Sequence, residues 1–353
     1  MRKLLFAVAA NVAGLVLLAG AGEFALRWRV EGGARAAWRS LIDSGAPFSD
    51  LGTGNTLIAD PELGYRYNPA RPEINSFGIR HAEIPPAKQP GIARVIVLGD
   101  SVSAPRDGYV SMLGERLRGR AEVINAAIPG YTTFQQRRLL ERHLLATGPD
   151  LVLVQYSLND HHRFLHRFDA GQRLLLTEDA RRALLPPGDG PLLRLARHSY
   201  LVFRLRMAAL RWRLRPGEFP WENQPDVAPA WQDDSWGVFE QHLAAMNDRL
   251  REGNARLAVI MAPYRPQLEE KVRARGLAFV LKPQRRMAET CSRRGIPLID
   301  LYPILAKTDW RPLFSDNYHF TAAGHRLVAE AVMEFLETRA GLSANLRTGP
   351  LSP

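Results

Sequence analysis

Short apolar runs recur along the chain from residue 94 onward, and most of them are rich in Val and Ile. The five runs span residues 94–98, 122–127, 151–156, 256–263 and 296–300. Continuous runs of this kind are typical of strands buried on both faces of a parallel sheet. Helical stretches separate or follow them, at residues 109–119, 133–147, 236–253 and 321–340. The alternation predicts an open α/β sheet with right-handed crossovers, whose site lies at the carboxyl ends of the strands.

The first apolar stretch of the chain has a different character. Residues 4–22 carry no charge and follow Arg2 and Lys3, which fits a transmembrane helix and also a signal peptide. We expect an uncleaved signal anchor, with a transmembrane helix over residues 1–30, because the run is long for a signal core. The alternative is a cleaved signal peptide and a secreted protein, and it rests on the small residues at 19–21. Both interpretations place the rest of the chain outside the cytoplasm.

The remaining sequence divides into three parts. Residues 31–90 form a loop-rich extension, since Pro, Gly, Asn and aromatic residues are mixed there without a helical period. Residues 91–340 contain the strand and helix pattern. Within them, residues 161–235 form a long insertion rich in Arg and Trp, either a lid or surface for an anionic lipid or polymer or an ordinary pair of surface helices. Residues 341–353 are expected to be a disordered tail.

Composition and charge narrow the function classes. The chain has 353 residues, of which 46% are hydrophobic and 24% charged, so a folded globular protein is expected. The net charge of +11 favours anionic partners such as nucleic acid, a membrane surface or an acidic polysaccharide. Nucleic acid is disfavoured, because the densest run of arginines lies in one insertion of a chain that carries an export signal. Cys291 is the single cysteine, which excludes an intrachain disulfide and a cysteine-rich zinc site.

Candidate chemistry begins directly after the first apolar run, in the stretch Gly99-Asp100-Ser101. Hydrolysis by a serine nucleophile needs a base that takes the hydroxyl proton and a group that orients the base. Asp316 and His319 lie three residues apart, just before the last helical stretch, so one short loop can carry both. In this interpretation His319 accepts the proton of Ser101, and Asp316 holds the imidazole.

Two further turns follow strand ends and offer hydrogen-bond donors. Gly130 comes after the second run, and a glycine lets its backbone N–H approach a ligand closely. Asn159 comes after the third run, and its side-chain amide is a second donor. With Ser101 and the Asp316–His319 pair, these residues all fall where the pattern places the crevice of the sheet.

Taken in order, these segments resemble the sequence blocks of the SGNH (GDSL-type) hydrolase superfamily. Gly99-Asp100-Ser101 resembles the nucleophile block and Gly130 the glycine block. Asn159-Asp160 resembles the Asn block, and Asp316-Asn317-Tyr318-His319 the D-x-x-H block. The resemblance covers roughly residues 92–338. The stretch before it resembles the membrane-anchored bacterial branch, which implies an inner-membrane protein with its main domain in the periplasm.

The resemblance implies a flavodoxin-like three-layer α/β/α fold with a five-stranded parallel sheet. It also implies ester hydrolysis without a metal or cofactor. By resemblance, Ser101 is the nucleophile, His319 the base and Asp316 its orienter. The oxyanion donors would be the Ser101 N–H, the Gly130 N–H and the side chain of Asn159.

The sequence departs from the family pattern at two positions. Ser157 stands where the third block usually has glycine, and Val102 replaces the leucine of the first block. The change at Ser157 is expected to affect the backbone at the strand end, while position 102 needs only to pack. Neither departure removes a catalytic group. The second glycine of the G-x-S-x-G elbow is also missing, which argues against the standard α/β-hydrolase fold.

Other residues allow a functional and a structural interpretation. The histidines at 161, 162 and 166 are conceivable metal ligands, but they are expected to be surface or rim residues. His325 is expected to be structural, and Ser103 lies too far from the strand end to be the nucleophile. The tryptophans in or beside the insertion could stack on sugars, although packing is the commoner use of Trp. They are Trp212, Trp221, Trp231 and Trp236.

The function expected from these observations is that of a membrane-anchored serine esterase. It would hydrolyse O-acyl esters, with an acylated small molecule or polysaccharide as substrate, through an acyl-enzyme on Ser101. One alternative is an O-acyltransferase that uses the same triad on a surface polysaccharide, because either water or a sugar hydroxyl can attack an acyl-enzyme. Another is a non-catalytic polysaccharide-binding protein on the same fold.

Overall fold

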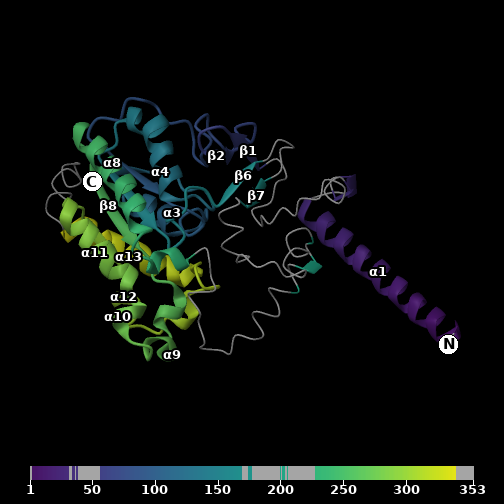
Figure 1. Cartoon of the computed structure of the whole chain (residues 1–353). Coiled ribbons are helices and arrows are strands. Elements are labelled where there is room, and N and C mark those ends of the chain that lie inside the picture. Colours follow the sequence, from purple (N-terminus) through teal and green to yellow (C-terminus); the bar gives the residue numbers. More distant parts are fainter. Residues whose placement is uncertain are drawn as a thin grey trace.

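A parallel sheet of five strands forms the centre of the molecule (Figure 1). Its strands are β3 (Ala93–Leu98), β4 (Ala121–Asn125), β5 (Leu151–Tyr156), β8 (Arg256–Met261) and β9 (Leu298–Asp300). They lie in the order β4-β3-β5-β8-β9. Counted along the chain this order is 2-1-3-4-5, as in flavodoxin-like folds. The α/β fold and the five-stranded parallel sheet are therefore confirmed.

The computed structural model describes most of the chain. The described residues are 2–31, 34–35, 37–38, 56–168, 174–176, 199, 201–202, 205 and 227–338. Most of the insertion at 161–235, with Trp212 and Trp221, and the tail at 341–353 lie outside these residues. The lid and the disordered tail therefore stay predictions.

Alternate residues of the central strands face two separate cores. Ile96 and Leu98 of β3 pack into one core, and Val95 and Val97 pack into the other. Every residue of β3 and β5 is buried, as expected for strands covered on both faces. The period-two alternation of apolar side chains thus supplies both sides of the sheet with a core.

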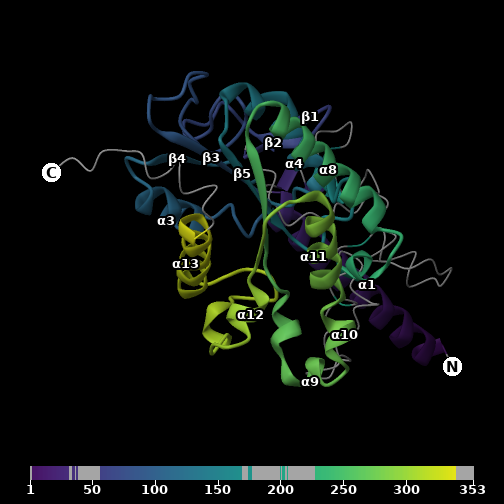
Figure 2. The ribbon, with the colours of Figure 1, turned by 90° about the vertical axis from the view of Figure 1, so that its left-hand side faces the viewer.

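Helices cover both faces of the sheet. The first face carries α4 (Thr133–Leu139), α8 (Trp236–Glu252) and α11 (Lys282–Arg294), and the second carries α3 (Tyr109–Arg116), α12 (Tyr302–Leu305) and α13 (Ala322–Thr338). Figure 2 shows α3 and α13 on one side of the strands and α8 and α11 on the other. The molecule therefore has three layers, and the carboxyl ends of the strands meet at one edge.

Short elements complete the described structure. A π-helix, Leu140–Leu144, and a 3₁₀ turn, Leu145–Thr147, follow α4. Further 3₁₀ turns are Ala228–Trp231, Arg265–Leu268 and Arg311–Leu313. Two small helices are α9 (Glu270–Arg273) and α10 (Leu277–Val280). Two antiparallel pairs lie outside the main sheet: β1 (Leu57–Asp60) with β2 (Gly64–Tyr67), and β6 (His166–Phe168) with β7 (Leu174–Leu176).

The amino-terminal segment forms one helix, α1 (Arg2–Glu31). Among the residues that the structure describes, no helix is long and apolar enough to cross a membrane. The predicted transmembrane helix over residues 1–30 is therefore not supported. The final third of α1 carries Glu23 and Arg27, which form a buried ion pair at 2.7 Å instead of continuing the apolar run. The location outside the cytoplasm stays a prediction.

Candidate active site

Ser101 lies in the tight turn that follows β3 at the carboxyl edge of the sheet. A side chain at Gly99 would place its Cβ 2.8 Å from the Oγ of Ser103 and 2.9 Å from the Oε1 of Gln155, so one of these buried side chains would have to move. The half-buried hydroxyl of Ser101 lies 2.8 Å from the Nε2 of His319. The turn therefore presents the hydroxyl to a residue that comes 218 positions later in the chain.

The loop before α13 brings Asp316 and His319 together. The Nδ1–H of His319 donates to the Oδ2 of Asp316 at 2.7 Å. The other oxygen of this carboxylate accepts the backbone N–H groups of Tyr318 and His319, at 2.7 and 2.8 Å. A β-bridge between Phe314 and Phe320 closes the loop. Ser101, His319 and Asp316 thus form one continuous chain of hydrogen bonds.

The environment of Asp316 favours its ionised form. Burial acts to raise the pKa of this carboxyl, but the hydrogen bonds from His319 and the Tyr318 N–H outweigh burial. The net result is a pKa below the ordinary value. Asp316 can therefore hold the His319 ring as an acceptor and stabilise its positive charge.

Residues that the sequence interpretation did not name brace this loop from outside. Arg265 donates to the Oδ1 of Asn317 through Nε and Nη2, at 3.1 and 2.8 Å. Its backbone N–H donates to the carbonyl of Asn317 at 3.0 Å. The rings of Tyr264 and Tyr318 are in contact, with centroids 4.8 Å apart. No local pattern identifies Arg265, because its partner lies 52 positions away.

Gly130 lies in the turn between β4 and α4, beside the Ser101 turn. Its φ of +75° is in the left-handed region, which favours glycine. The N–H of Ile128, in the same turn, donates to the carbonyl of Gly99 at 3.2 Å and joins the two turns. Within the described part of the chain, no acceptor is bonded to the backbone N–H of Gly130 or of Ser101. Both N–H groups are therefore free to bind a ligand.

Asn159 lies in the turn after β5, on the other side of the Ser101 turn. It is half-buried, and its side-chain Oδ1 has no hydrogen-bond partner among the described residues. No hydrogen bond joins its amide to Ser101, His319 or Asp316 in the described structure. The structure thus assembles Ser101, His319 and Asp316 directly and places Gly130 and Asn159 in the two flanking turns.

Ser157 lies at the start of the Asn159 turn, next to the Ser101 turn. Its hydroxyl accepts the amide of Gln155 at 2.9 Å and lies close enough to the carboxyl of Asp100 to lower the pKa of that group. Asp100 also accepts the N–H of Val102 at 2.9 Å. Burial nevertheless raises the pKa of Asp100. The residue that replaces the expected glycine therefore lies between two strand ends, close to a buried carboxyl group.

The neighbouring acid, Asp160, is also buried. Its pKa lies well above the ordinary value, first because of burial and second because of the nearby Asp100. One of its oxygens accepts the N–H of Ser157 at 3.2 Å. Two buried carboxyl groups thus follow the ends of β3 and β5, and burial first and their mutual repulsion second raise the pKa of Asp160.

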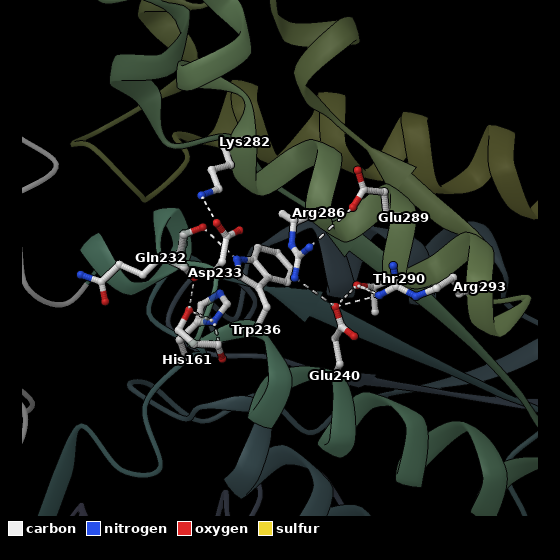
Figure 3. Close-up of polar contacts among 12 residues, drawn as sticks. His161, Gln232, Asp233, Trp236, Glu240, Lys282, Arg286, Glu289, Thr290 and Arg293 are labelled. Carbon is white, nitrogen blue, oxygen red and sulfur yellow. Dashed lines mark hydrogen bonds and ion pairs between the residues drawn. The ribbon is translucent and has the colours of Figure 1, made fainter.

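The histidines that were weighed as metal ligands have structural environments instead. His161 is half-buried: its Nε2 lies 2.7 Å from the hydroxyl of Tyr156, and its Nδ1 lies 3.1 Å from the hydroxyl of Ser235. Figure 3 shows its ring beside Trp236, with centroids 4.7 Å apart. His166 is buried, so the surface or rim prediction is wrong for this residue. Across the described residues, no group of three or more His, Cys, Asp or Glu side chains could hold a metal ion.

Two other side chains have clear structural surroundings. The Nδ1 of His325 accepts the backbone N–H of Tyr109 at 3.3 Å, and the two rings are stacked. The fully buried hydroxyl of Ser103 lies 2.7 Å from that of Tyr109 and donates to Gln155 at 3.1 Å. Trp231 and Trp236 are buried. These residues support the site by packing beneath and beside it.

Burial of His161 predicts a pH dependence of stability. Burial lowers the pKa of His161 from 6.5 to about 3, so between these values the unfolded chain binds a proton that the folded chain does not. The stability that His161 contributes is therefore fully present above pH 6.5 and is lost as the pH falls toward 3. Between pH 7 and pH 4 the loss is about 3 kcal/mol.

Urea unfolding of wild type and His161→Gln at both pH values measures this loss. The glutamine retains a donor and an acceptor but does not titrate. We expect the variant to lose about 3 kcal/mol less free energy of unfolding on acidification than wild type. Equal losses in the two proteins would show that His161 is not held neutral by the fold.

Comparisons with known proteins add a family match. A sequence model described as the GDSL-like lipase/acylhydrolase family matches residues 97–327, more than half of the chain. No curated protein sequence matches this chain. Among solved structures, TesA is similar with 17% identity and a TM-score of 0.42, covering 69% of this chain and 98% of that chain.

Two other solved structures give similar values. The acetyl xylan esterase AlAXEase has 16% identity and a TM-score of 0.42, covering 69% of this chain and 99% of its own. The lipase/acylhydrolase from Enterococcus faecalis has 15% identity and a TM-score of 0.41, covering 70% and 97%. At these TM-scores the likenesses support no argument about the site.

Proposed function

The chain belongs to the GDSL-like lipase/acylhydrolase family and is a hydrolase, and we propose that it is a serine esterase that cleaves O-acyl esters through an acyl-enzyme on Ser101. One observation carries this proposal. The hydroxyl of Ser101, the imidazole of His319 and the carboxylate of Asp316 are joined by hydrogen bonds of 2.8 and 2.7 Å. Such a chain supplies a nucleophile, a base and an orienting group in the order that ester cleavage needs.

The first half of the reaction transfers the acyl group to the protein. The Oγ of Ser101 attacks the ester carbonyl carbon while the Nε2 of His319 takes the hydroxyl proton. The carbonyl oxygen becomes an oxyanion, and the N–H groups of Ser101 and Gly130 and the amide of Asn159 are its proposed donors. The tetrahedral intermediate collapses, the bond to the alcohol oxygen breaks, and His319 returns its proton to the leaving alcohol.

The second half releases the acid. A water molecule gives its proton to His319 and attacks the acyl carbon, and the same donors stabilise the second oxyanion. Collapse breaks the bond to Oγ, and His319 protonates Ser101 again. Asp316 holds the ring through Nδ1 in both halves, so Nε2 alternates between acceptor and donor without a change of ring orientation.

A cavity of about 470 Å³ supports a substrate class. Ala104 and Ala127 line it, three residues along the chain from Ser101 and from Gly130 respectively. Its charged lining residues are Glu73, Arg80, Arg106, Glu115 and Arg118. Three cationic and two acidic side chains therefore line this cavity, while Ser101, His319 and Asp316 are not among its lining residues.

The arginines of this cavity are not fully neutralised. Glu73 is shared between Arg71 at 2.8 Å and Arg106 at 3.7 Å. The Nε of Arg80 has no hydrogen-bond partner among the described residues. Together with the net charge of +11, the surplus of cationic side chains in the cavity supports an ester whose alcohol part carries an anionic group. We therefore propose an O-acylated acidic carbohydrate as the substrate.

A matched pair of substrates tests the substrate class. Methyl 3-O-acetyl-glucuronoside and methyl 3-O-acetyl-glucoside differ by one carboxylate. We expect kcat/KM to be about tenfold higher for the glucuronoside, the effect of one hydrogen bond to a charged group. Arg106→Gln should reduce this preference, whereas Arg249→Gln, an exposed arginine paired with Glu252, should not. Equal kcat/KM values for the two esters in wild type would contradict the proposed substrate class.

Hydrolysis and transfer to a second sugar share the same acyl-enzyme. The side chains of His319 and Asp316 are 40% and 52% exposed, which supports access of water and therefore hydrolysis. Incubation of the protein with the acetylated glucuronoside and an excess of unacetylated oligosaccharide distinguishes hydrolysis from transfer, because hydrolysis releases only free acetate. Appearance of acetylated oligosaccharide would favour the O-acyltransferase.

A further inference from the structure

The peptide bond between Pro129 and Gly130 is held from the amino-terminal extension. The hydroxyl of Tyr65, on β2, donates to the carbonyl oxygen of Pro129 at 2.7 Å. This oxygen belongs to the same peptide group as the N–H of Gly130. In a planar trans peptide the C=O and the N–H point in opposite directions. A donor that fixes the carbonyl therefore also fixes the direction of the Gly130 N–H.

Tyr65 is suited to donate this hydrogen bond. Its side chain is fully buried, and burial, with smaller contributions from Tyr131 and Asp100, raises its pKa well above the ordinary value. The hydroxyl therefore keeps its proton throughout the working range of an esterase. No other side-chain donor reaches the Pro129 carbonyl in the described structure.

Reciprocal contacts lock Tyr65 in place. The hydroxyl of Tyr131, the residue after Gly130, donates to the backbone carbonyl of Tyr65 at 2.5 Å. The two rings lie edge to face with centroids 5.3 Å apart. The amide of Gln135 donates to the carbonyl of Leu63 at 2.7 Å, at the start of the same hairpin strand. Hydrogen bonds in both directions thus hold the β1–β2 hairpin against the Gly130 turn.

We propose that Tyr65 is a positioning residue for the oxyanion hole, acting through the Pro129–Gly130 peptide. This inference rests on the proposed function. A hydrogen bond accepted by a carbonyl polarises the whole peptide group and strengthens the donor at its other end. The Gly130 N–H has no acceptor among the described residues, so it is free for the oxyanion. Tyr65 lies outside residues 97–327, the part that matches the family.

The proposal predicts an effect on the transition state and not on substrate binding. Negative charge develops on the carbonyl oxygen only during the reaction, so a donor for it changes kcat more than KM. Tyr65→Phe removes the hydroxyl and keeps the ring. We expect kcat for p-nitrophenyl acetate to fall about tenfold, less than loss of an oxyanion donor itself, with KM within about twofold.

A transition-state analogue separates positioning from a loss of folded protein. A trifluoromethyl ketone adds to Ser101 and forms a tetrahedral oxyanion that resembles the intermediate. Its inhibition constant should rise about tenfold in Tyr65→Phe, in parallel with the fall in kcat/KM. Titration with a fluorophosphonate gives the fraction of active protein, so that kcat is expressed per active site. A merely structural role would lower that fraction and leave both constants unchanged.

Matched variants complete the experiment. Tyr302→Phe removes a hydroxyl that has no partner in the described structure, and both constants should stay within about twofold of wild type. If Tyr65→Phe does not fold, Tyr131→Phe is used instead, because it removes the hydrogen bond to the backbone of Tyr65. It should change kcat and the inhibition constant together, by a smaller factor. The proposal would be overturned if kcat and the inhibition constant of Tyr65→Phe equalled those of wild type. If Tyr65→Phe does not fold, the same result in Tyr131→Phe would overturn it. A wild type no more active than Ser101→Ala would overturn the esterase function, and the role of Tyr65 with it.

Discussion

Ser101→Ala is expected to lower kcat/KM for p-nitrophenyl acetate about 10⁴-fold or more. The alanine removes the only atom that forms the acyl-enzyme, and His319 then has no hydroxyl proton to accept. What activity remains comes from the oxyanion donors and from substrate binding alone. The hydroxyl of Ser101 is half-buried, and its one hydrogen bond among the described residues is to His319. The fold should therefore be retained when it is removed.

Steady-state kinetics with purified protein measures this loss, and circular dichroism confirms the fold. Ser292→Ala is the matched control, because Ser292 is an exposed residue of α11 far from Ser101 in the fold. Its kcat/KM should equal that of wild type. If Ser101→Ala retained more than about a tenth of the activity, Ser101 could not be the nucleophile.

Asp316→Asn is expected to lower kcat/KM by about 10²- to 10³-fold. The asparagine has the same shape, but it removes the negative charge beside the His319 ring and no longer requires a proton on Nδ1. The ring can then present a protonated Nε2 to Ser101 and cannot accept its proton. The loss should be smaller than for Ser101→Ala, because the carboxylate is 52% exposed and water can take part of its place.

Asp309→Asn provides the control for Asp316→Asn. Asp309 precedes the same loop, is 70% exposed and only forms an ion pair with Arg311 at 3.5 Å. The same kinetic assay should show no change for this variant. Activity of Asp316→Asn within about threefold of wild type would show that the observed hydrogen bond does not orient the base.

The sequence pattern predicts the central sheet well, because strands buried on both faces need continuous apolar runs. The runs at 94–98 and 151–156 coincide with β3 and β5 to within a residue. The later runs extend past the strands: β8 ends at Met261 before Pro263, and β9 begins at Leu298 after Pro297. Proline lacks the N–H that a strand ladder needs, which sets both limits.

The residues of the candidate site are recognisable because each follows a strand end or precedes a helix. What supports them is not recognisable from local pattern. Tyr65 contacts Pro129 across 64 positions, and Arg265 contacts Asn317 across 52. A local motif contains no information about such partners. The sequence shows that Ser157 replaces the expected glycine, but its closeness to Asp100 appears only when β3 and β5 lie side by side.

Two predictions that the structure does not support also depend on distant contacts or on charge. The histidines at 161, 162 and 166 have the composition of a surface segment, yet His166 is buried and both ring nitrogens of the half-buried His161 are hydrogen-bonded to Tyr156 and Ser235. The apolar start of the chain was extended into a transmembrane helix over residues 1–30. No described helix meets the length and apolarity that this requires, and α1 carries the ion pair of Glu23 and Arg27.

Labelling with a fluorophosphonate tests the central claim most directly, because this probe reacts with a serine whose hydroxyl is activated by a neighbouring base. The folded wild-type protein should take up one equivalent, and peptide mass spectrometry should place the adduct on Ser101. Ser101→Ala should take up none, and His319→Ala should react far more slowly. An adduct on Ser103 or on any other serine, or no adduct on folded wild type, would contradict the account.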